Sequence, residues 1–188
     1  MIKKTLKKII YFFFLPISFL FLFLWKIKIM SYKSCGQILS KIPGIIGIII
    51  RQAFYNLTLK KCGKNIRVFY GAFIVYPTVT IGDNCTIEEF SIISNCDIGN
   101  DVIIAARVSI MSGAHHHDTS DIDNSFYNSK SSVKKISLGN NIWIGTHAII
   151  MNNIGSHSVI GAGSVVTKEI DAYVVAVGVP AKIIKKRL

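Results

Sequence analysis

Three consecutive histidines, His115–His117, stand in a polar stretch of a chain that is otherwise rich in Ile, Val and Gly. The acidic residue Asp118 follows them directly. Histidine titrates near neutral pH, so a positioned imidazole can take a proton from a weak acid such as a hydroxyl group. Imidazoles also bind metals, but neighbouring side chains of an extended chain point in different directions, which disfavours three adjacent ligands. A catalytic site, a metal site and an ordinary polar loop are the interpretations that the flanking sequence has to separate.

The flanking sequence repeats an aliphatic residue every six positions. A fixed short period is typical of a solenoid of parallel strands, in which each hexapeptide forms one strand and one corner. Glycine often follows the aliphatic residue, and glycine tolerates the positive φ of a tight corner. We therefore predict an all-β fold, a parallel β-helix over residues 65–188 that is interrupted by a loop at 112–135. The aliphatic residues expected to point inward are Val75, Ile81, Ile87, Ile92, Ile98, Ile104, Ile110, Leu138, Ile144, Ile150, Ile154, Ile160 and Val166.

This repeat resembles the hexapeptide repeat of the left-handed β-helix acyltransferases. The stretch "NIWIGTHAIIMNNIGSHSVIGAGSVVTKEIDAYVVAVGVPAKIIKK" is similar to the corresponding part of the maltose and galactoside O-acetyltransferases. The upstream "IPGIIGIIIRQAFYNLTLKKCGKN" resembles a segment of the branch that serves surface-polysaccharide synthesis. The resemblance covers roughly residues 40–188 and implies a left-handed parallel β-helix. One departure from the sugar acetyltransferases is that Ile150 and Ile154 are four residues apart rather than six.

The resemblance also implies which histidine acts as the base. In these acyltransferases an S/T-G-x-H pattern carries the essential histidine, on a loop that projects toward a neighbouring subunit. Residues 112–115 match this pattern, so His115 is the expected base and His117 is the second candidate. Asp118 and Asn95 are the candidates to orient the imidazole ring. The position that we align with a functional asparagine of the galactoside enzymes is Cys85.

Acetyl-CoA is the acyl donor that the resemblance implies, and no metal is expected. The segments "GAGSVVTK" and "GVPAKIIKKR" match the region that contacts CoA in the sugar acetyltransferases. Small residues leave room for the pantetheine arm, and lysines stabilise the charge of the phosphates. The corner at 145–146 is the expected source of backbone N–H donors for the oxyanion. The residues expected to bind the cofactor are Trp143, Gly145, Thr146, Gly161, Ala162, Ser164, Thr167, Lys168, Lys182 and Lys185.

The N-terminal third carries the whole excess of positive charge. Residues 1–64 contain 12 of the 22 Lys and Arg residues and none of the 10 Asp and Glu residues. An apolar run with lysines on both sides fills residues 9–25, and its aliphatic character favours lipid over nucleic acid as the partner. We predict a membrane-associated helical segment at 1–30, which suits a shallow or re-entrant helix better than a single span. Residues 31–64 are expected to form an amphipathic helix or linker, lying at the interface or packed on the β-helix. The membrane surface is thus the expected partner of residues 1–60.

The four cysteines show neither the spacing of a metal site nor that of a disulfide framework, so we expect free thiols. The combined prediction is an acetyl-CoA-dependent O-acetyltransferase that acts on a sugar hydroxyl of a cell-surface polysaccharide precursor, with a lipid-linked oligosaccharide as an acceptor. The resemblance implies a homotrimer, and the charge pattern implies the cytoplasmic face of the inner membrane of a bacterium. The alternatives are an amino-sugar N-acetyltransferase, a serine acetyltransferase or a non-catalytic β-helix scaffold.

Overall fold

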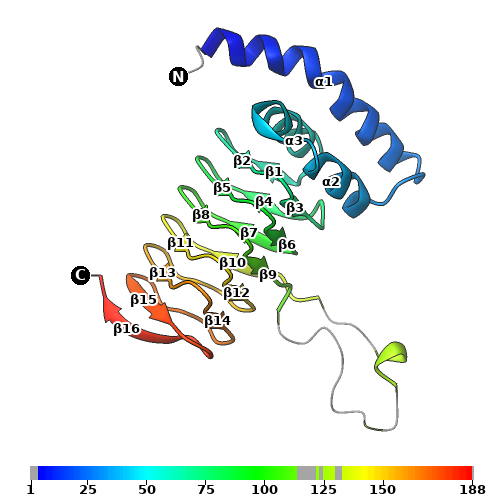
Figure 1. Cartoon of the computed structure of the whole chain (residues 1–188). Coiled ribbons are helices and arrows are strands. Elements are labelled where there is room, and N and C mark those ends of the chain that lie inside the picture. Colours follow the sequence, from blue (N-terminus) through cyan, green and yellow to red (C-terminus); the bar gives the residue numbers. More distant parts are fainter. Residues whose placement is uncertain (1–3, 114–121, 123–124, 130–132, 188) are drawn as a thin grey trace.

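Three helices precede the β-structure. The computed structural model describes residues 4–113, 122, 125–129 and 133–187, with side chains from Tyr11 onward. The helices are α1 (Lys4–Lys26), α2 (Tyr32–Ser40) and α3 (Gly44–Thr58). Ser31 caps α2, because its hydroxyl accepts a hydrogen bond from the Ser34 N–H (3.0 Å). Figure 1 shows α1 beyond α3, at one end of a long stack of β-coils.

Short strands form the three sides of a solenoid, which we call sheets A, B and C. Sheet A contains β1, β4, β7 and β10, sheet B contains β2, β5, β8, β11, β13, β15 and β16, and sheet C contains β3, β6, β9, β12 and β14. The described strands pair in parallel, apart from the antiparallel pair β15–β16. A 3-10 turn, η1 (Phe126–Asn128), lies in the inserted loop. The strand bounds are β1 Lys61–Cys62, β2 Arg67–Val68, β3 Phe73–Ile74, β4 Thr80–Ile81, β5 Thr86–Ile87, β6 Ile92–Ile93, β7 Cys96–Ile98, β8 Ile103–Ile104, β9 Ser109–Ile110, β10 Ile136–Leu138, β11 Trp143–Ile144, β12 Ile149–Ile150, β13 Val159–Ile160, β14 Val165–Val166, β15 Val174–Val177 and β16 Lys182–Lys186.

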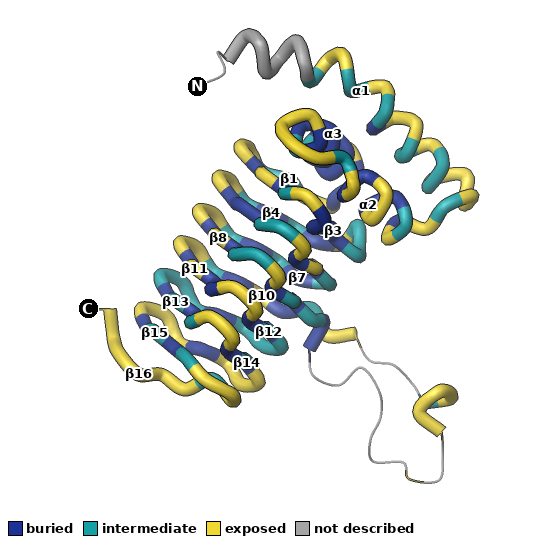
Figure 2. The backbone as a smooth tube through the Cα atoms, in the orientation of Figure 1, coloured by how far each residue is buried: buried dark blue, intermediate teal, exposed yellow. Residues whose placement is uncertain are grey.

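At least one aliphatic residue from each strand between β2 and β15 is buried inside the solenoid, where it stacks on its counterparts in neighbouring coils. In sheet B this column is continuous and fully buried, and Figure 2 shows the alternation of buried strands and exposed corners. Burial of a large aliphatic side chain contributes about 1.5–3 kcal/mol, so these columns supply most of the stabilisation of the coils. The predicted parallel β-helix of six-residue repeats is confirmed. The sheet B column consists of Val68, Ile87, Ile104, Ile144, Ile160 and Ala176.

Two of the predicted inward positions are wrong. Ile93, not Ile92, points inward, since Ile93 is fully buried and Ile92 is 41% exposed. Likewise Ile74 takes the inward position in place of Val75. The predicted inward positions Ile87 and Ile92 put a five-residue step before β6, whereas the structure has this step after β6, from Ile93 to Ile98. Two adjacent aliphatic residues fit either face of a strand, so the sequence alone did not distinguish the two registers.

All irregular steps of the repeat fall at the corner between sheet C and the following strand of sheet A, the C/A corner. The step from Ile74 to Ile81 is seven residues and that from Ile93 to Ile98 is five. Ile150 to Ile154 is four residues, as noted in the sequence, and the inserted loop leaves the solenoid after β9 at the same corner. The C/A corner is therefore the place where this fold accepts a change in chain length.

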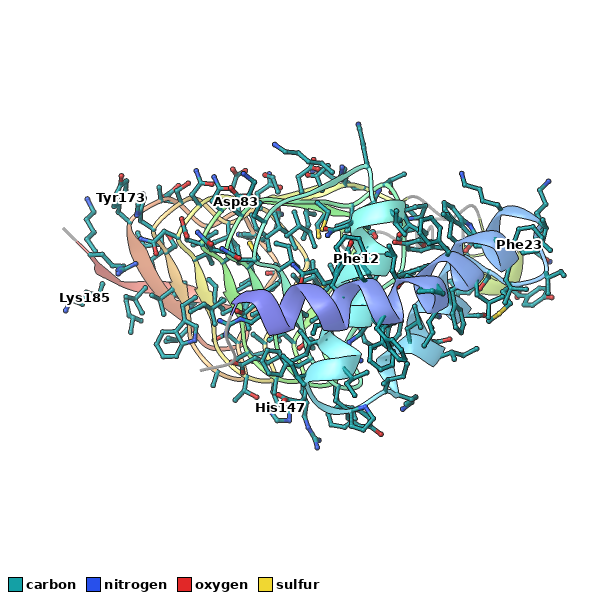
Figure 3. All side chains as sticks on the ribbon, turned by 90° about the horizontal axis from the view of Figure 1, so that it is seen from above. Phe12, Phe23, Asp83, His147, Tyr173 and Lys185 are labelled. Atoms are coloured by element: carbon teal, nitrogen blue, oxygen red, sulfur yellow. The ribbon has the colours of Figure 1, made fainter. Side chains whose placement is uncertain are left out.

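The other two corners join sheet A to sheet B (the A/B corner) and sheet B to sheet C (the B/C corner). At each of them one residue has a positive φ, in the left-handed region of the backbone. At the A/B corner, Asn65 donates to the Asn84 carbonyl (3.0 Å), and Asn84 donates to the Asp101 carboxylate (2.9 Å). Further along, the rings of His157 and Tyr173 stack with centroids 4.6 Å apart. Asn and Asp are the non-glycine residues that accept this conformation most readily. The positive-φ residues are Asn65, Asn84, Asp101, Asn141, His157 and Tyr173 at the A/B corner, and Gly71, Phe90, Arg107, His147 and Gly163 at the B/C corner. Figure 3 labels Tyr173 and His147 on opposite edges of the solenoid.

The helices α2 and α3 cover the first coil and are joined to it by a buried cation. Arg51 of α3 is fully buried and donates to the carbonyl oxygens of Val68 (2.8 Å), Leu39 (2.9 Å) and Ile42 (2.8 Å). Burial lowers the pKa of its guanidinium to about 10, so it stays charged at neutral pH. The alternative in which this segment packs on the β-helix is therefore the one that the structure shows, although two helices stand where one was expected. In the part of the chain that is described, no helix is both long enough and apolar enough to cross a membrane.

A substitution at Gly99 tests how closely the coils are stacked. A Cβ atom at Gly99 would lie 2.6 Å from the Gly139 carbonyl oxygen of the next coil. We expect Gly99→Ala to lower the free energy of unfolding by about 1–3 kcal/mol, because the backbone has to move apart. Gly163→Asn is the control, since Gly163 has nothing within 4 Å of a Cβ and asparagine accepts its φ of +67°. Thermal unfolding followed by circular dichroism measures both, and equal melting temperatures for the two variants would contradict the stacking argument.

Candidate active site

The two ends of the inserted loop are bound together at the C/A corner. The Ser112 hydroxyl is buried, lies 2.5 Å from the Ser94 hydroxyl and accepts a hydrogen bond from the Asn95 N–H (2.9 Å). On the returning strand, the Lys134 N–H donates to the Ser112 carbonyl (3.1 Å). The loop therefore starts and ends at one fixed point beside β7 and β9.

An ion pair fastens the returning end of the loop. The Lys135 ammonium lies 2.5 Å from the Asp97 carboxylate and donates to the Thr78 carbonyl (2.9 Å). The Thr80 hydroxyl donates to the same carboxylate. Partial burial would raise the pKa of Asp97, but the hydrogen bonds from Lys135 and Thr80 outweigh it and lower the pKa. Sequence reasoning did not single out this pair, because nothing local relates Lys135 to Asp97 across the insertion.

The predicted catalytic residues His115, His117 and Asp118 lie outside the described residues. Asn95, a candidate to orient the base, is at the base of the loop, where its side-chain carbonyl accepts from the Thr78 hydroxyl (2.8 Å). Cys85 is buried and its thiol donates to the Gly99 carbonyl (3.1 Å), so its side chain is held inside the solenoid.

Four of the predicted cofactor residues meet at the B/C corner. Gly145 and Gly161 end equivalent strands, β11 and β13, and a Cβ at Gly145 would lie 2.5 Å from the Ala162 nitrogen. The Thr146 hydroxyl donates to the Ala106 carbonyl (2.7 Å), which fixes the exposed side chain against the preceding coil. Gly161 and Ala162 bring no large side chain to this corner, which leaves room there for an extended ligand arm. The Gly145 N–H donates to the Ile160 carbonyl (2.8 Å), so it is not the free oxyanion donor that we expected.

The remaining cofactor residues are spread over other parts of the solenoid. Trp143 is 56% exposed on the outer face of sheet B. Thr167 and Lys168 are exposed at the C/A corner after β14, and Lys182 and Lys185 are exposed on β16. Ser164 differs from the expectation: it is buried, and its hydroxyl accepts from the Gly178 N–H (3.1 Å), which makes it a structural residue of the corner.

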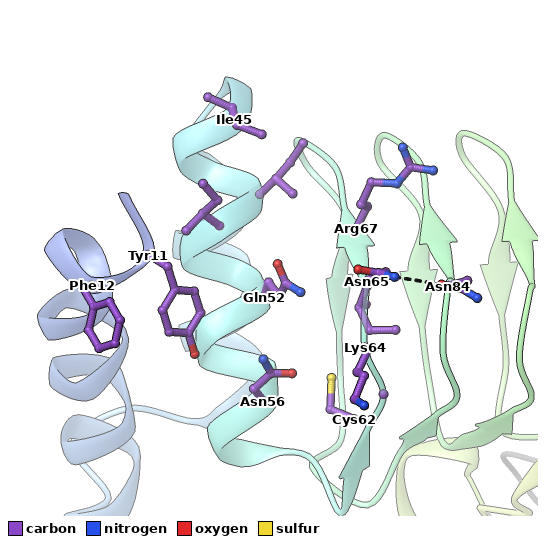
Figure 4. A pocket seen from close by; sticks show the side chains of 14 residues that line it. Tyr11, Phe12, Ile45, Gln52, Asn56, Cys62, Lys64, Asn65, Arg67 and Asn84 are labelled. Carbon is purple, nitrogen blue, oxygen red and sulfur yellow. Dashed lines mark hydrogen bonds between the residues drawn. The ribbon is translucent and has the colours of Figure 1, made fainter. Parts of the chain in front are cut away.

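A groove at the helical end of the solenoid lies away from all of these residues. It has a volume of about 1060 Å³ and is lined by α1, α3 and the first coil (Figure 4). None of the predicted catalytic or cofactor residues lines it. Within the described ranges, no group of three or more His, Cys, Asp or Glu side chains could hold a metal ion.

The four cysteines are free thiols, as predicted. Burial raises the pKa of Cys62 to about 11, and it also raises the pKa of Cys35, Cys85 and Cys96. All four are therefore protonated at neutral pH and are poor nucleophiles and poor metal ligands.

Comparison with known proteins agrees with the repeat and the fold. Residues 78–112 match the family model described as bacterial transferase hexapeptide (six repeats). The galactoside O-acetyltransferase of Escherichia coli K12 is 37% identical over 131 residues, which cover 66% of this chain and 55% of that protein. A solved maltose O-acetyltransferase of Clostridium difficile 630 superposes with a TM-score of 0.73 and 29% identity, over 85% of this chain and 87% of that one. A galactoside acetyltransferase solved in complex with coenzyme A has a TM-score of 0.70 and 29% identity, over 83% and 80% of the two chains.

In its repeat and its fold, the chain is similar to the hexapeptide-repeat transferases. The predicted resemblance to the maltose and galactoside O-acetyltransferases is confirmed. The chain spans about half the length of the first curated relatives that it matches.

The ion pair at the loop base is tested by Lys135→Ala. We expect chymotrypsin to cut after Phe126 or Tyr127, which are 62% and 95% exposed, about two- to fivefold faster in this variant, since a partly exposed pair contributes up to about 1 kcal/mol. The matched control is Lys134→Ala, in which the neighbouring lysine is removed and the ion pair remains. Mass spectrometry of the fragments identifies the cut, and equal rates in the two variants would show that the pair does not hold the loop.

The lowered pKa of Asp97 gives the same pair a pH dependence. Because the pKa is lower in the folded protein, the pair stabilises the fold above the unfolded-state pKa of about 4 and is lost as the pH falls below it. Exchange protection of the Ile136 amide, corrected for the intrinsic rate, should therefore decrease in acid in the wild type. Asp97→Asn should show little change over the same range.

Proposed function

We propose that the protein is an acetyl-CoA-dependent O-acetyltransferase that acts on a sugar hydroxyl. The observation that carries this proposal is the similarity to the galactoside O-acetyltransferase, 37% identical over 131 residues, in a chain that has the same solenoid. The inserted loop with its S-G-x-H pattern and the small residues Gly161 and Ala162 of the B/C corner supply the two parts that the reaction needs: a base and a site for the donor.

The proposed reaction is a direct transfer. His115 takes the proton of the acceptor hydroxyl as the oxygen attacks the thioester carbonyl of acetyl-CoA. The tetrahedral intermediate then collapses, the bond from carbon to sulfur breaks, and the imidazolium returns the proton to the departing thiolate. The products are an O-acetyl sugar and free CoA. Asp118 or Asn95 orients the imidazole, and His117 is the second candidate for the base.

The donor is proposed to lie along the B/C corner. Thr146, Gly161 and Ala162 form the edge that the pantetheine arm follows, and Trp143 packs beside the arm from sheet B. Thr167 and Lys168 meet the nucleotide end, and Lys182 and Lys185 on β16 stabilise the charge of the phosphates. These lysines are exposed and therefore accessible to a ligand.

The acceptor and the setting remain part of the proposal. The sugar is one in a precursor of a cell-surface polysaccharide, and the basic, apolar N-terminus favours an acceptor linked to a lipid. The protein acts as a homotrimer on the cytoplasmic face of the inner membrane of a bacterium, where acetyl-CoA is available.

Removal of the proposed base is the first test. We expect His115→Ala to lower turnover by about 10²–10⁴-fold, because general-base catalysis contributes this much, while acetyl-CoA still binds in calorimetry. The readout is the O-acetyl signal in proton NMR of the surface polysaccharide from a host deletion strain complemented with each variant. His116→Ala is the matched control and should restore the signal. If His115→Ala restores it as well and His117→Ala does not, His117 is the base.

Substitution of a proposed donor-binding lysine tests where acetyl-CoA binds. We expect Lys168→Ala to raise the KM for acetyl-CoA about three- to tenfold with little change in kcat, since a charge-assisted contact to a phosphate contributes about 1 kcal/mol. Lys186→Ala removes an equally exposed lysine that is not assigned to the donor, and its KM should stay at the wild-type value. A loss of kcat in Lys168→Ala without a change in KM would place this lysine elsewhere.

A further inference from the structure

One face of α1 is fixed against the protein. The Ser18 side chain is fully buried, and its hydroxyl donates to the Ile50 carbonyl of α3 (3.0 Å). Phe14, Ile17, Phe21 and Trp25 lie on the same side of the helix and pack against the core. Because this face is occupied by α2 and α3, α1 cannot be surrounded by lipid on all sides.

The opposite face of α1 is exposed and almost wholly apolar. Its exposed positions recur with helical spacing, so they form one continuous stripe. On α1 the stripe runs from Phe12 to Lys26, and exposed apolar residues just after the helix extend it. We call this whole surface the outer face. Its large side chains are Phe12 (71% exposed), Phe13 (77%), Phe19 (47%), Leu20 (53%), Phe23 (58%) and Ile27 (44%). Figure 3 labels Phe12 and Phe23 along this helix.

The charge around the outer face indicates what covers it. Residues 1–64 contain 12 basic and no acidic residues, and Lys26, Lys28 and Lys33 lie at the C-terminal end of the stripe. A second copy of the chain would bring the same cations together and be repelled. An anionic lipid surface attracts them and receives the aromatic side chains.

The groove beside α1, like the outer face, combines apolar side chains with basic ones. Tyr11 and Phe12 form one wall and isoleucines of α3 the other, while Lys64 and Arg67 of the first coil stand at its polar side (Figure 4). The Arg67 guanidinium is held in place by a hydrogen bond to the Thr86 hydroxyl (3.0 Å). An apolar wall next to cationic side chains suits the acyl chain and the phosphate of a phospholipid.

We propose that the outer face of α1 docks the protein onto an anionic phospholipid bilayer, with the helix lying in the plane of the interface. The 23 residues of α1 extend about 35 Å along that plane. The stack of coils runs from α1 and α3 to β15 and β16 at the opposite end, so the solenoid projects away from the lipid (Figure 1). This deepens the membrane setting proposed above, and it does not depend on the transfer reaction.

Vesicle flotation of the purified full-length protein, without substrates, tests the docking. We expect the wild type to float with mixed phosphatidylcholine–phosphatidylglycerol vesicles, more weakly with phosphatidylcholine alone, and less as salt is raised. The double variant Phe19→Ser/Phe23→Ser should bind roughly tenfold or more weakly, because two aromatic side chains no longer enter the interface. Phe126→Ser is the matched control, since Phe126 is 62% exposed but lies in the inserted loop, and it should float like the wild type.

The orientation has its own readout. A Phe23→Trp variant should gain fluorescence that phospholipids brominated near the headgroup quench more strongly than phospholipids brominated near the chain ends. Stronger quenching from the chain ends would show a deeply inserted helix and overturn the in-plane arrangement.

Two results would overturn the docking itself. One is undiminished flotation of Phe19→Ser/Phe23→Ser while its circular dichroism spectrum stays native. The other is a change in oligomeric state of that variant in sedimentation velocity with no vesicle binding by the wild type, which would make the outer face a contact between copies. Neither result bears on His115, so the transfer reaction is judged separately.

Discussion

The spacing between stacked coils governs the rest of this structure. Parallel strands lie about 4.8 Å apart, so each strand residue of a coil lies directly on its counterpart in the next. An inward side chain meets the same position above and below, which selects aliphatic residues throughout. At the corner after each sheet A strand the backbones approach so closely that Gly82, Gly99 and Gly139 have no room for a Cβ atom.

This spacing also determines where chemistry can be placed. Each A/B corner, and each B/C corner from Gly71 to Gly163, contains a positive-φ residue, so these corners offer regular edges such as the one that Thr146 and Ala162 form. The C/A corner varies in length from coil to coil, and the long insertion leaves the solenoid there. The proposed base is thus carried by the irregular corner, and the proposed donor site by a regular one. Ser112, Asp97 and Lys135 fix the ends of the insertion to the coils.

The sequence predicted the solenoid because its signal is repeated many times, and one misplaced position such as Ile92 does not change the period. His147 and His157, which break no step of the repeat, are corner residues with positive φ angles. The sequence could not predict the Lys135–Asp97 pair, which depends on how an insertion folds back. Nor could it predict the buried role of Ser164, because a small polar residue suits both a ligand channel and a corner hydrogen bond. Nor did the sequence indicate that Arg51 lies in the interior, where it donates to the backbone carbonyls of Val68, Leu39 and Ile42.

The reversal of the chain at β16 has a consequence for solubility. A stack of parallel coils exposes unpaired backbone groups at each end, and such an end is a template on which another copy could add and grow into a fibre. At one end α3 lies across the first coil, and at the other β16 runs antiparallel to β15. The outer edge of β16 is short and bears Lys182, Lys185 and Lys186, whose charges repel the same edge of another copy. The five-residue strand β16 therefore hinders the addition of another copy at this end of the solenoid.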